Sequence, residues 1–289
     1  MAIQESELIL NPDGSVYHLN LLPEHIADTI ITVGDPDRVP GVTKYFESIE
    51  FSTHKREFHT QTGIYKGKRM TVISTGIGTD NIDIVFNELD ALVNIDLKTR
   101  TINKTHKSLD IVRIGTSGSI QKNIGIDTFV ISEKACGFDS LLHFYNSKHI
   151  QQTDVSDALI AHTDWSEDKS KPYVVTADKA LFAKLESDQT TKGFTATNVG
   201  FYGPQGRILR LSIQDNDLND KLATFSYNNQ AITNLEMETA GIYGLAGLLG
   251  HRAVSMNAII ANRATGEFSK DPKLVVENLI QYTLDKLVQ

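Results

Sequence analysis

The chain has 289 residues, of which 40% are hydrophobic and 22% are charged, and this is the composition of an ordinary globular protein. Its length suffices for one large α/β domain or two small ones, and we expect a single domain over residues 1–289. Lys and Arg number 28 against 36 Asp and Glu, which gives a formal net charge of −8. Such a balance argues against a nucleic-acid partner, because phosphate backbones are bound by clustered cations.

The sequence also gives an expectation for the cellular compartment. It contains no apolar run of the roughly 18 residues that a membrane span requires. Residues 1–10 carry two acids and no basic stretch, unlike a secretory signal. Cys136 is the one cysteine and cannot form an internal disulfide, which fits a reducing environment. We therefore expect a cytoplasmic protein with no membrane partner.

The predicted elements alternate between short strands and helices, and glycine follows several of the strands. In chain order, the expected strands are residues 29–33, 70–74, 109–114, 128–132, 173–176 and 253–261. Helices are expected over 82–93, after an Asp178 N-cap, and from Asp271 and Pro272 to the end of the chain. Residues 215–233 are polar and weakly periodic, which predicts an exposed helix or a mobile insertion.

Alternation of this kind predicts an α/β fold with a mixed, mostly parallel central sheet flanked by helices. Ligands of such folds gather at the carboxyl ends of the strands. The segment Gly34-Asp35-Pro36-Asp37-Arg38 follows the first expected strand. Its glycine allows close approach of the backbone to a ligand, and Arg38 adds a fixed positive charge for an anion. A plain strand-to-helix turn explains the same residues.

A second candidate anion site is Arg113-Ile114-Gly115-Thr116. Arg113 lies within an apolar strand, and a buried guanidinium needs a negative partner, which is either a protein carboxylate or a bound anion. Thr116 can supply a hydroxyl at the end of that strand. A third cation, Arg56, stands in a segment that reads most simply as a hairpin edge with solvated charges.

Two later segments offer groups for an organic substrate. Between Phe201 and Arg207, Gly203-Pro204 demands a turn, Phe201 can stack on a planar ring, and Gln205 carries a donor and an acceptor on one amide. That set suits the edge of a uracil ring, although a surface loop is the plainer interpretation. Glu238 precedes a helix rich in small residues, where a carboxylate either accepts hydrogen bonds from a ribose diol or favours the helix N-terminus.

Taken together, these segments resemble the nucleoside phosphorylase family, of the uridine phosphorylase type. The resemblance spans Tyr17-His18-Leu19 to Asn262-Arg263. Its most specific parts are Gly34-Asp35-Pro36-Asp37-Arg38, Arg113-Ile114-Gly115-Thr116-Ser117-Gly118-Ser119-Ile120-Gln121, the Phe-Tyr-x-x-Gln-x-Arg pattern of 201–207, and Glu236-Met237-Glu238. It implies a reversible phosphorolysis of uridine to uracil and ribose 1-phosphate in pyrimidine salvage, with phosphate as co-substrate and no cofactor.

The resemblance also implies a role for each matching residue. The phosphate-binding residues would be Gly34, Arg38, Arg56, Arg113 and Thr116. The ribose-binding residues would be His18, Met237 and Glu238, and the base-binding residues would be Phe201, Gln205, Arg207 and Arg263. Among these, Arg113, Arg207 and Glu238 would act on the reacting groups.

In this family a neighbouring subunit completes the site, here with Arg56 and His18, so a homo-oligomer is implied, either a dimer or a hexamer. Some members bind a monovalent cation between subunits, and Glu57 and Ser74 match its ligands, which makes them a candidate K⁺ site. Purine-specific relatives place an Asp near the purine N7. Here Asn262-Arg263-Ala264-Thr265 has no carboxylate, which favours a pyrimidine.

Three alternatives remain open at this point. A nucleosidase of the same fold would use water in place of phosphate, and a purine nucleoside phosphorylase would differ in its base. A non-catalytic nucleoside or dinucleotide sensor is a different class of protein. It is suggested by Gly76-Ile77-Gly78 between a strand and a helix, but Asn81 stands where a dinucleotide motif needs its third glycine.

Overall fold

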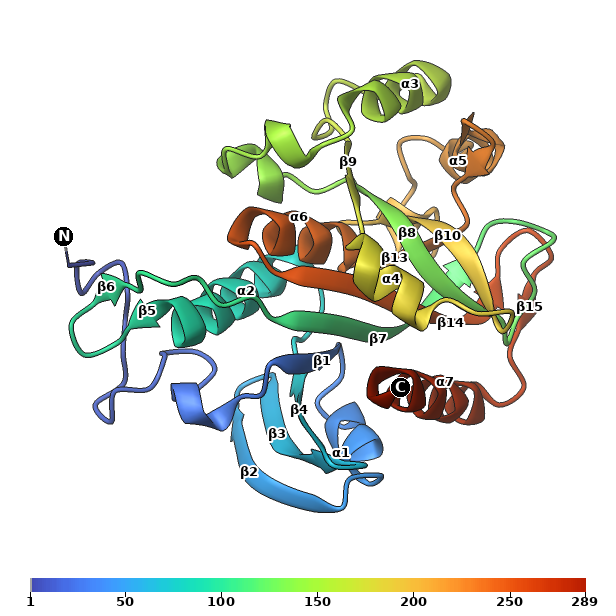
Figure 1. Cartoon of the computed structure of the whole chain (residues 1–289). Helices are drawn as coiled ribbons and strands as arrows, with labels where there is room; N and C mark the ends of the chain where they lie inside the picture. Colours follow the sequence, from blue (N-terminus) through green and yellow to red (C-terminus); the bar gives the residue numbers. More distant parts are fainter. Residues whose placement is uncertain (1) are drawn as a thin grey trace.

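The computed structural model describes residues 2–289 (Figure 1). The strands are β1 (Thr29–Val33), β2 (Ser48–Lys55), β3 (Phe58–Tyr65), β4 (Lys68–Ser74), β5 (Ile95–Asp96), β6 (Thr101–Ile102), β7 (Asp110–Ser119), β8 (Phe129–Gly137), β9 (Tyr173–Thr176), β10 (Thr190–Thr197), β11 (Ser226–Tyr227), β12 (Gln230–Ala231), β13 (Asn234–Glu236), β14 (Arg252–Asn262) and β15 (Glu267–Phe268). The helices are α1 (Arg38–Thr43), α2 (Thr79–Asn94), α3 (Thr153–Thr163), α4 (Lys179–Leu185), α5 (Leu218–Thr224), α6 (Thr239–Leu249) and α7 (Pro272–Val288), with short 3₁₀ turns between them.

Eleven strands of the described chain form one mixed sheet, as the strand and helix pattern predicted. Parallel pairs build its centre, where β1 lies between β4 and β7, and β14 runs parallel to β7. The outer hairpins, β2 with β3 and β3 with β4, are antiparallel. Beyond β7 the sheet curls on itself, since β7 pairs with β14, β14 with β8, β8 with β10, β10 with β13, and β13 again with β7. These five strands therefore form a closed ring.

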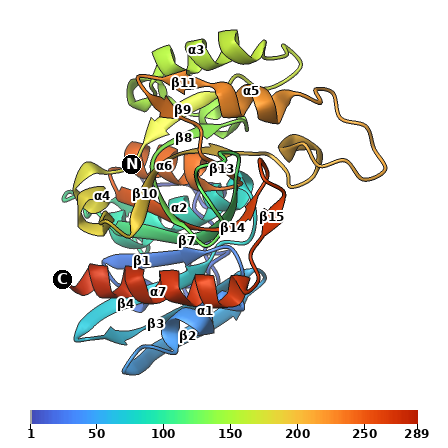
Figure 2. The ribbon, with the colours of Figure 1, turned by 90° about the vertical axis from the view of Figure 1, so that its right-hand side faces the viewer.

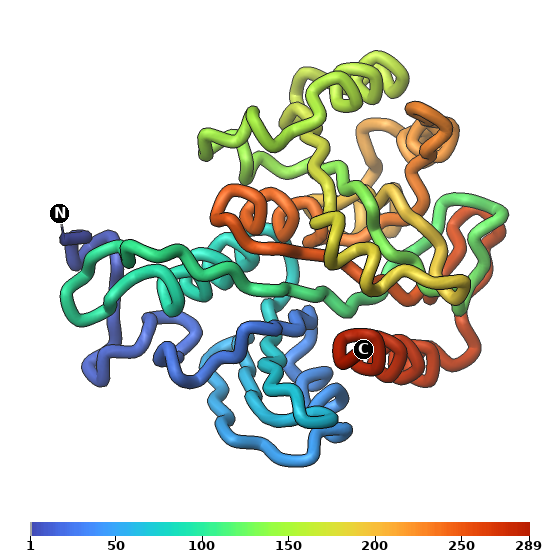
Figure 3. Tube along the Cα trace, in the orientation of Figure 1, coloured from blue at the N-terminus to red at the C-terminus, as the bar shows by residue number. Residues whose placement is uncertain are grey.

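Helices cover both sides of the sheet. On one side α2 and α6 pack against each other, with α6 also against β8 and β14. On the other side α7 packs on β7 and β14, with α1 and α4 beside it (Figure 2). The N-terminal segment follows a separate course to the β5–β6 turn, where the backbone amide of Ile3 donates to the carbonyl of Arg100 at 2.7 Å (Figure 3). None of the helices in residues 2–289 is both long enough and apolar enough to cross a membrane.

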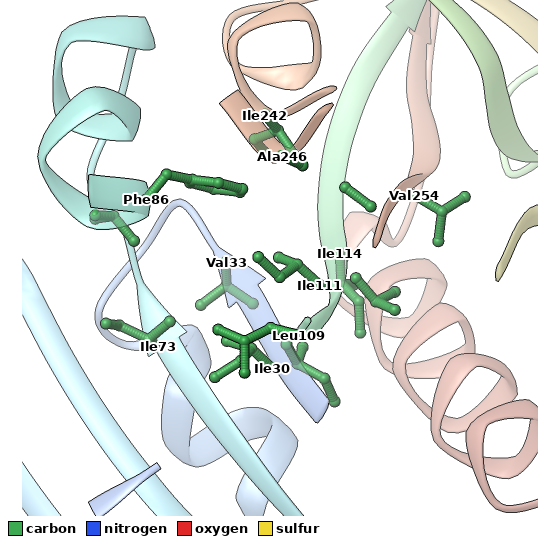
Figure 4. Packing of buried hydrophobic residues seen from close by; sticks show 14 of the residues in the cluster. Ile30, Val33, Ile73, Phe86, Leu109, Ile111, Ile114, Ile242, Ala246 and Val254 are labelled. Carbon is green, nitrogen blue, oxygen red and sulfur yellow. The ribbon is translucent and has the colours of Figure 1, made fainter. Parts of the chain in front are cut away.

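The apolar core lies between the parallel strands and their helices (Figure 4). Ile30 and Val33 of β1 meet Ile111 of β7, and Phe86 of α2 approaches from the helix side. Each fully buried side chain of this size contributes roughly 1.5–3 kcal/mol relative to leaving it in water. The core thus holds β1, β4 and β7 in register, and their carboxyl ends meet at one edge.

Several expected elements are confirmed, and two expected ends are wrong. β1 spans residues 29–33 as predicted, and the side chain of Asp178 caps α4 by accepting from the amide of Leu181. The strand expected to end at residue 114 continues to Ser119, because its later residues pair with both β13 and β14. The strand expected to end at 132 continues to Gly137 through its pairing with β10 and β9. Contacts with distant strands, rather than local sequence, set these ends.

The weakly periodic stretch over 215–233 is a short helix followed by a small hairpin. It contains α5 and the antiparallel pair β11–β12. Leu218 and Leu222 are its buried apolar side chains on α5, and they join a second, smaller apolar cluster. The expected helix in this stretch is therefore present.

Candidate functional site

A cavity of about 750 Å³ opens at the carboxyl ends of the central strands, where ligands were expected. The segments after β1 and β4, the second half of β7, the junction of β13 with α6, and the loop after β10 all reach it. The side chains and glycines that line it and were expected at a site are Gly34, Arg38, Arg113, Thr116, Phe201, Gln205, Arg207, Met237 and Glu238. Segments spread over some 200 residues of sequence thus meet in one space.

One end of the cavity carries two arginines of like charge. Arg38 is the first residue of α1, and the turn before it is held by Asp35, whose carboxylate accepts from the amide of Asp37 at 2.9 Å. Burial and the nearby charge of Arg113 lower the pKa of Arg38, against the pull of Asp35. Two guanidinium groups brought this close are stabilised by an anion between them. Gly34 and Thr116 line the same part of the cavity.

Arg113 is held on two sides by protein groups. Its Nη2 donates to Glu238 at 2.6 Å and lies 3.2 Å from Glu236, while Nη1 donates to Asn257 at 2.9 Å. Burial opposes its charge, but the two carboxylates outweigh burial and raise the pKa of Arg113. The salt-bridge interpretation of the sequence is confirmed, because Arg113 forms a buried ion pair with two carboxylates. Arg113 also lines the cavity, and its role as an anion site stays a prediction.

The path of the Arg113 side chain depends on the glycine two positions later. A Cβ atom placed on Gly115 would lie 2.0 Å from Nη1 of Arg113, far inside van der Waals contact. The Arg113 side chain therefore lies along the strand, with its guanidinium directly over the Cα of Gly115, where any other residue would place a side chain. This explains why the strand carries a glycine between Ile114 and Thr116 even though its backbone remains extended.

The two carboxylates at the β13–α6 junction have different functions in the fold. Glu236 accepts from the amides of Glu238 and Thr239 and from the hydroxyl of Thr239, and its other oxygen accepts from Thr197 at 2.6 Å. It thus caps α6, as one interpretation of the sequence held for this pair of acids. Within residues 2–289, Glu238 accepts from the amide of Gly78 at 2.9 Å and from Arg113. Of the two, Glu238 has more acceptor capacity left for a ligand.

Burial raises the pKa of Glu238, and the charge of Glu236 adds to this effect, while Arg113 opposes it. Between the ordinary carboxyl value of 4.5 and this raised value, the folded protein binds a proton that the unfolded chain has lost. The contribution of Glu238 to the free energy of unfolding therefore falls as pH rises through that window.

The variant Glu238→Gln removes this titration without changing the shape of the side chain. We expect the free energy of unfolding of the variant, relative to wild type, to increase as pH is raised above 4.5 and the Glu238 carboxyl of the wild type loses its proton. The gain follows from the raised pKa of the Glu238 carboxyl, because a glutamine has no proton to lose over this range. Urea unfolding at several pH values measures it, with Glu277→Gln as control because Glu277 forms an exposed pair with Lys44. A difference from wild type that is constant with pH would contradict the raised pKa.

The opposite end of the cavity is built by the loop after β10. Gln205 is buried, and its Oε1 accepts from Nη1 of Arg207 at 2.7 Å. The guanidinium of Arg207 also lies 3.8 Å from the centre of the Phe201 ring, a close cation–π contact. Burial and the charge of Arg263 lower the pKa of Arg207. A planar amide, a guanidinium and an aromatic ring therefore stand together on the cavity wall.

Arg263 supports this loop from behind. It follows β14, and its Nη1 donates to the backbone carbonyl of Gln205 at 2.9 Å. Asn219 of α5 donates to the same carbonyl at 3.0 Å, so α5 also helps to hold the loop. Arg263 is not among the described residues that line the cavity. Its side chain instead contacts the backbone of the loop after β10.

Of the four remaining expected residues, Glu57 lines the cavity, whereas His18, Arg56 and Ser74 are not among the described residues that line it in the same chain. His18 is paired through Nδ1 with Glu88 at 2.6 Å, and Arg56 stands at the β2–β3 turn with φ +56°. Glu57 lines the cavity, and its backbone carbonyl accepts from the hydroxyl of Ser74 at 2.5 Å. Glu57 and Ser74 are therefore neighbours, as a shared K⁺ site requires, and the K⁺ site itself stays a prediction.

The sequence did not single out several residues that complete the site. Ser117, Gly118, Ile77 and Phe268 also line the cavity, and Asn257 holds Arg113 from within the sheet. Ser117 and Gly118 stand in the quoted Arg113–Gln121 motif, so that motif carried a signal for them. Asn257 lies at the centre of the mostly apolar strand β14, where a buried amide was the available signal.

A second cavity, of about 870 Å³, lies on the other side of the loop after β10. Phe138, Trp165 and Leu211 are among its apolar walls, and Tyr202 and Arg207 belong to both the loop and this cavity. The segment between β10 and α5 extends outward here before the chain returns to the body of the protein (Figure 2). Of the base-binding candidates, Arg207 therefore lines both cavities, while Phe201 and Gln205 line the first alone.

One group of side chains elsewhere has the composition of a metal site. Asp90, His106 and His251 place one potential ligand atom each within 4.8 Å of one another. However, Nδ1 of His251 accepts from the backbone amide of Leu109 at 3.2 Å, so the hydrogen of the neutral ring is on Nε2, which faces Asp90 at 3.3 Å. A metal ion at Nε2 would require that backbone bond to break. The geometry instead fits a structural histidine in the turn between α6 and β14, which bonds the backbone before β7 and places Nε2 near Asp90 of α2.

Comparisons with known proteins agree with this geometry. A family model described as "Phosphorylase superfamily" matches residues 28–288. The chain is 30% identical over 264 residues to a uridine phosphorylase of Thermococcus kodakarensis, which covers 89% of this chain and 81% of the relative. It is also 25% identical over 281 residues to a DeoD-type purine nucleoside phosphorylase of Shewanella amazonensis, over 94% of this chain and 98% of the relative.

Among solved structures, the chain is similar to a nucleoside phosphorylase of Trypanosoma brucei that shows uridine phosphorylase activity. The TM-score is 0.88 at 27% identity, over 97% of this chain and 99% of that one. A uridine phosphorylase of Phytophthora capsici has the same fold, with a TM-score of 0.71 at 21% identity over 100% of this chain and 99% of that one.

Proposed function

This chain belongs to the phosphorylase superfamily as a nucleoside phosphorylase of the uridine phosphorylase type, and is therefore a pentosyltransferase; from this premise we propose that its substrates are uridine and inorganic phosphate. The products would be uracil and ribose 1-phosphate. The observation that carries the choice of base is the buried amide of Gln205, held by Arg207 at 2.7 Å on the cavity wall.

The phosphate would bind at the end of the cavity where Arg38 and Arg113 approach each other. Gly34 allows the backbone close to the anion, and Thr116 can donate its hydroxyl. A phosphate fixed there is held below the anomeric carbon of the ribose, which turns a bimolecular attack into a nearly intramolecular one. This gain in rate comes from holding the phosphate in place, so Arg38 and Arg113 need not contact the bond that breaks.

The ribose would lie over Met237 and Glu238, between the two ends of the cavity. Glu238 retains acceptor capacity beside Gly78 and Arg113, which suits the hydroxyls of a ribose diol. As the bond from C1′ to the base breaks, positive charge develops on the ribose ring. The phosphate and the Glu238 carboxylate place negative charge near it.

The base would be held by Phe201, Gln205 and Arg207. The electron pair of the breaking bond moves onto the departing uracil, and Arg207 and the Gln205 amide are donors already in place for that charge. A phosphate oxygen then forms the new bond to C1′. Uracil with its two carbonyl oxygens and the N–H between them matches an amide beside a guanidinium.

The preference for a pyrimidine is supported by the residues behind the base loop. The stretch Asn262-Arg263-Ala264-Thr265 has no carboxyl group that could, in its acid form, protonate a purine N7. Arg263 instead donates to the backbone of Gln205 and is engaged in holding the loop. A purine would thus lack the acid that its leaving group needs.

The active unit would be a homo-oligomer, a dimer or a hexamer, in the cytoplasm and in pyrimidine salvage. Arg56 and His18 lie outside the cavity of their own chain, as residues that serve a neighbouring subunit would. His18 is already oriented by Glu88 at 2.6 Å, which would fix its ring for a contact with a partner's ribose. Glu57 and Ser74 would hold K⁺ between subunits.

A panel of nucleosides in phosphate buffer tests the proposed substrate. Uridine, deoxyuridine, thymidine, inosine and adenosine are compared by release of the free base. We expect kcat/KM for uridine to exceed that for inosine by at least about 10²-fold, since a site built for a hydrogen-bond pattern discriminates strongly against a base that leaves its buried groups unpaired. The DeoD-type relatives give the second candidate, a purine enzyme, and faster turnover of inosine than of uridine would establish it.

A further inference from the structure

The closed ring of strands β7, β14, β8, β10 and β13 encloses buried polar side chains. Six of them, from all five strands, belong to one hydrogen-bonded set: Arg113, Ser117, Ser132, Thr195, Asn234 and Asn257. A buried polar group that lacks a partner costs roughly 1–3 kcal/mol, so a set of this size persists only when its members satisfy one another.

The hydrogen bonds run from Arg113 around the ring of strands to Ser117, which also lies on β7 and lines the cavity. Arg113 donates to Asn257, whose Nδ2 donates to the hydroxyls of Ser132 at 3.3 Å and Ser255 at 3.2 Å. Ser132 and Thr195 share a hydrogen bond of 2.6 Å. The set continues from Thr195 through Asn234 to Ser117, with bonds of 3.0 Å each.

The orientation of the Asn257 amide follows from these partners. A guanidinium can only donate, so the oxygen of Asn257 must face Nη1 of Arg113, and its nitrogen must face the two serines. The amide therefore cannot flip without leaving Arg113 against a second donor. Asn257 lies 144 residues from Arg113 in sequence but beside it across the parallel β7–β14 pair.

The charge of Arg113 and its partners explains why the acceptor beside Nη1 is the neutral amide of Asn257. The Nη2 side of Arg113 already meets two carboxylates, Glu236 and Glu238. A third acid would neutralise the guanidinium further and weaken its attraction for an anion in the cavity. An apolar side chain would leave the Nη1 protons unpaired and the guanidinium free to turn.

We propose that Asn257 is a positioning residue for phosphate binding: it fixes the orientation of the Arg113 guanidinium without adding negative charge beside it. This inference rests on the proposed function, in which Arg113 binds phosphate. Asn257 would thus affect the reaction through Arg113, since it is not itself among the described residues that line the cavity.

The test compares Asn257→Asp, which has the same shape and adds a charge, with Asn257→Leu, which removes the acceptor. Titration calorimetry with inorganic phosphate gives Kd directly, and kinetics give KM for phosphate and for uridine separately. We expect Asn257→Asp to raise the phosphate Kd at least about tenfold while KM for uridine stays within about twofold, because a charge in a buried site acts through a low effective dielectric. Asn257→Leu should raise the phosphate Kd by a smaller factor and lower kcat.

Asn94→Asp is the matched control. Asn94 is also a buried amide, at the end of α2, and it donates to Asp90 at 2.7 Å, so the variant places an added carboxylate beside an acid but away from Arg113. We expect a lower Tm with an unchanged phosphate Kd. If wild type binds phosphate and Asn257→Asp binds it equally well, or loses phosphate and uridine affinity in parallel, the positioning role is refuted. Wild type that does not bind phosphate would instead refute the proposed function.

Discussion

Arg113→Ala is expected to lower kcat/KM for phosphate by at least about 10³-fold and to destabilise the fold by about 3–5 kcal/mol. The variant leaves Glu236 and Glu238 buried without the cation that now lies 3.2 Å and 2.6 Å from them. It also removes one of the two arginines at the anion end of the cavity. Steady-state kinetics and urea unfolding measure the two effects.

Because Arg113→Ala can fail by unfolding, Arg113→Lys separates the two roles. A lysine keeps the charge but has one nitrogen in place of the fork that now reaches Asn257 and Glu238 separately. We expect it to fold and still to lose about 10²-fold in kcat/KM for phosphate. Arg252→Ala is the control on the neighbouring strand, where an exposed arginine pairs with Asp110. Full activity of Arg113→Lys would show that Arg113 is structural only.

Arg207→Ala is expected to have the second large effect, about a 10²–10³-fold loss in kcat/KM for uridine with the phosphate Kd unchanged. The variant removes the donor that holds Oε1 of Gln205 and the guanidinium packed on Phe201. Charge on the departing uracil would then lack its cationic partner. Kinetics with uridine and calorimetry with phosphate measure the two ends of the cavity separately.

Arg210→Ala is the matched control for this loop. Arg210 is an exposed arginine three residues further along the chain, and it lines the second cavity rather than the first. We expect its uridine kinetics to equal those of wild type. A loss of phosphate affinity in Arg207→Ala, or an equal loss of uridine turnover in both variants, would contradict the assignment of the base end.

The sequence predicted the parts of the fold that local signals determine. The β-branched run Thr29–Val33 and the caps at Asp178 and Asp271 fall where they were expected, because propensity and capping act over a few residues. Likewise Gln205 and Arg207 were expected in one site, and they bond each other two positions apart.

The parts that were missed depend on contacts between distant segments. Strand β7 continues past Ile114 because β13 and β14 offer partners for its second half, and nothing near Gly115 in sequence indicates this. Asn257 reads as an unremarkable strand residue until β14 is placed beside β7. The partner of Arg113 was left open for the same reason, since Glu238 lies 125 residues away.

The assignments of His18 and Arg56 are of another kind. They follow from the resemblance alone, and within one chain both residues lie away from the cavity that the structure describes. Arg56→Ala and His18→Ala mixed with a chain inactivated at Arg113 would report whether neighbouring subunits share sites. The local geometry of these two residues gives no indication of function by itself: Arg56 stands in a turn with positive φ, and His18 shares a hydrogen bond with Glu88.

Release of uracil from uridine, with and without inorganic phosphate, tests the central claim most directly. The phosphate-free arm uses protein freed of bound anion and a buffer without phosphate, sulfate or arsenate. We expect turnover that requires phosphate and yields ribose 1-phosphate in equal amount with uracil. Equal rates of uracil release in both arms, with free ribose as the second product, would contradict it and identify a hydrolase.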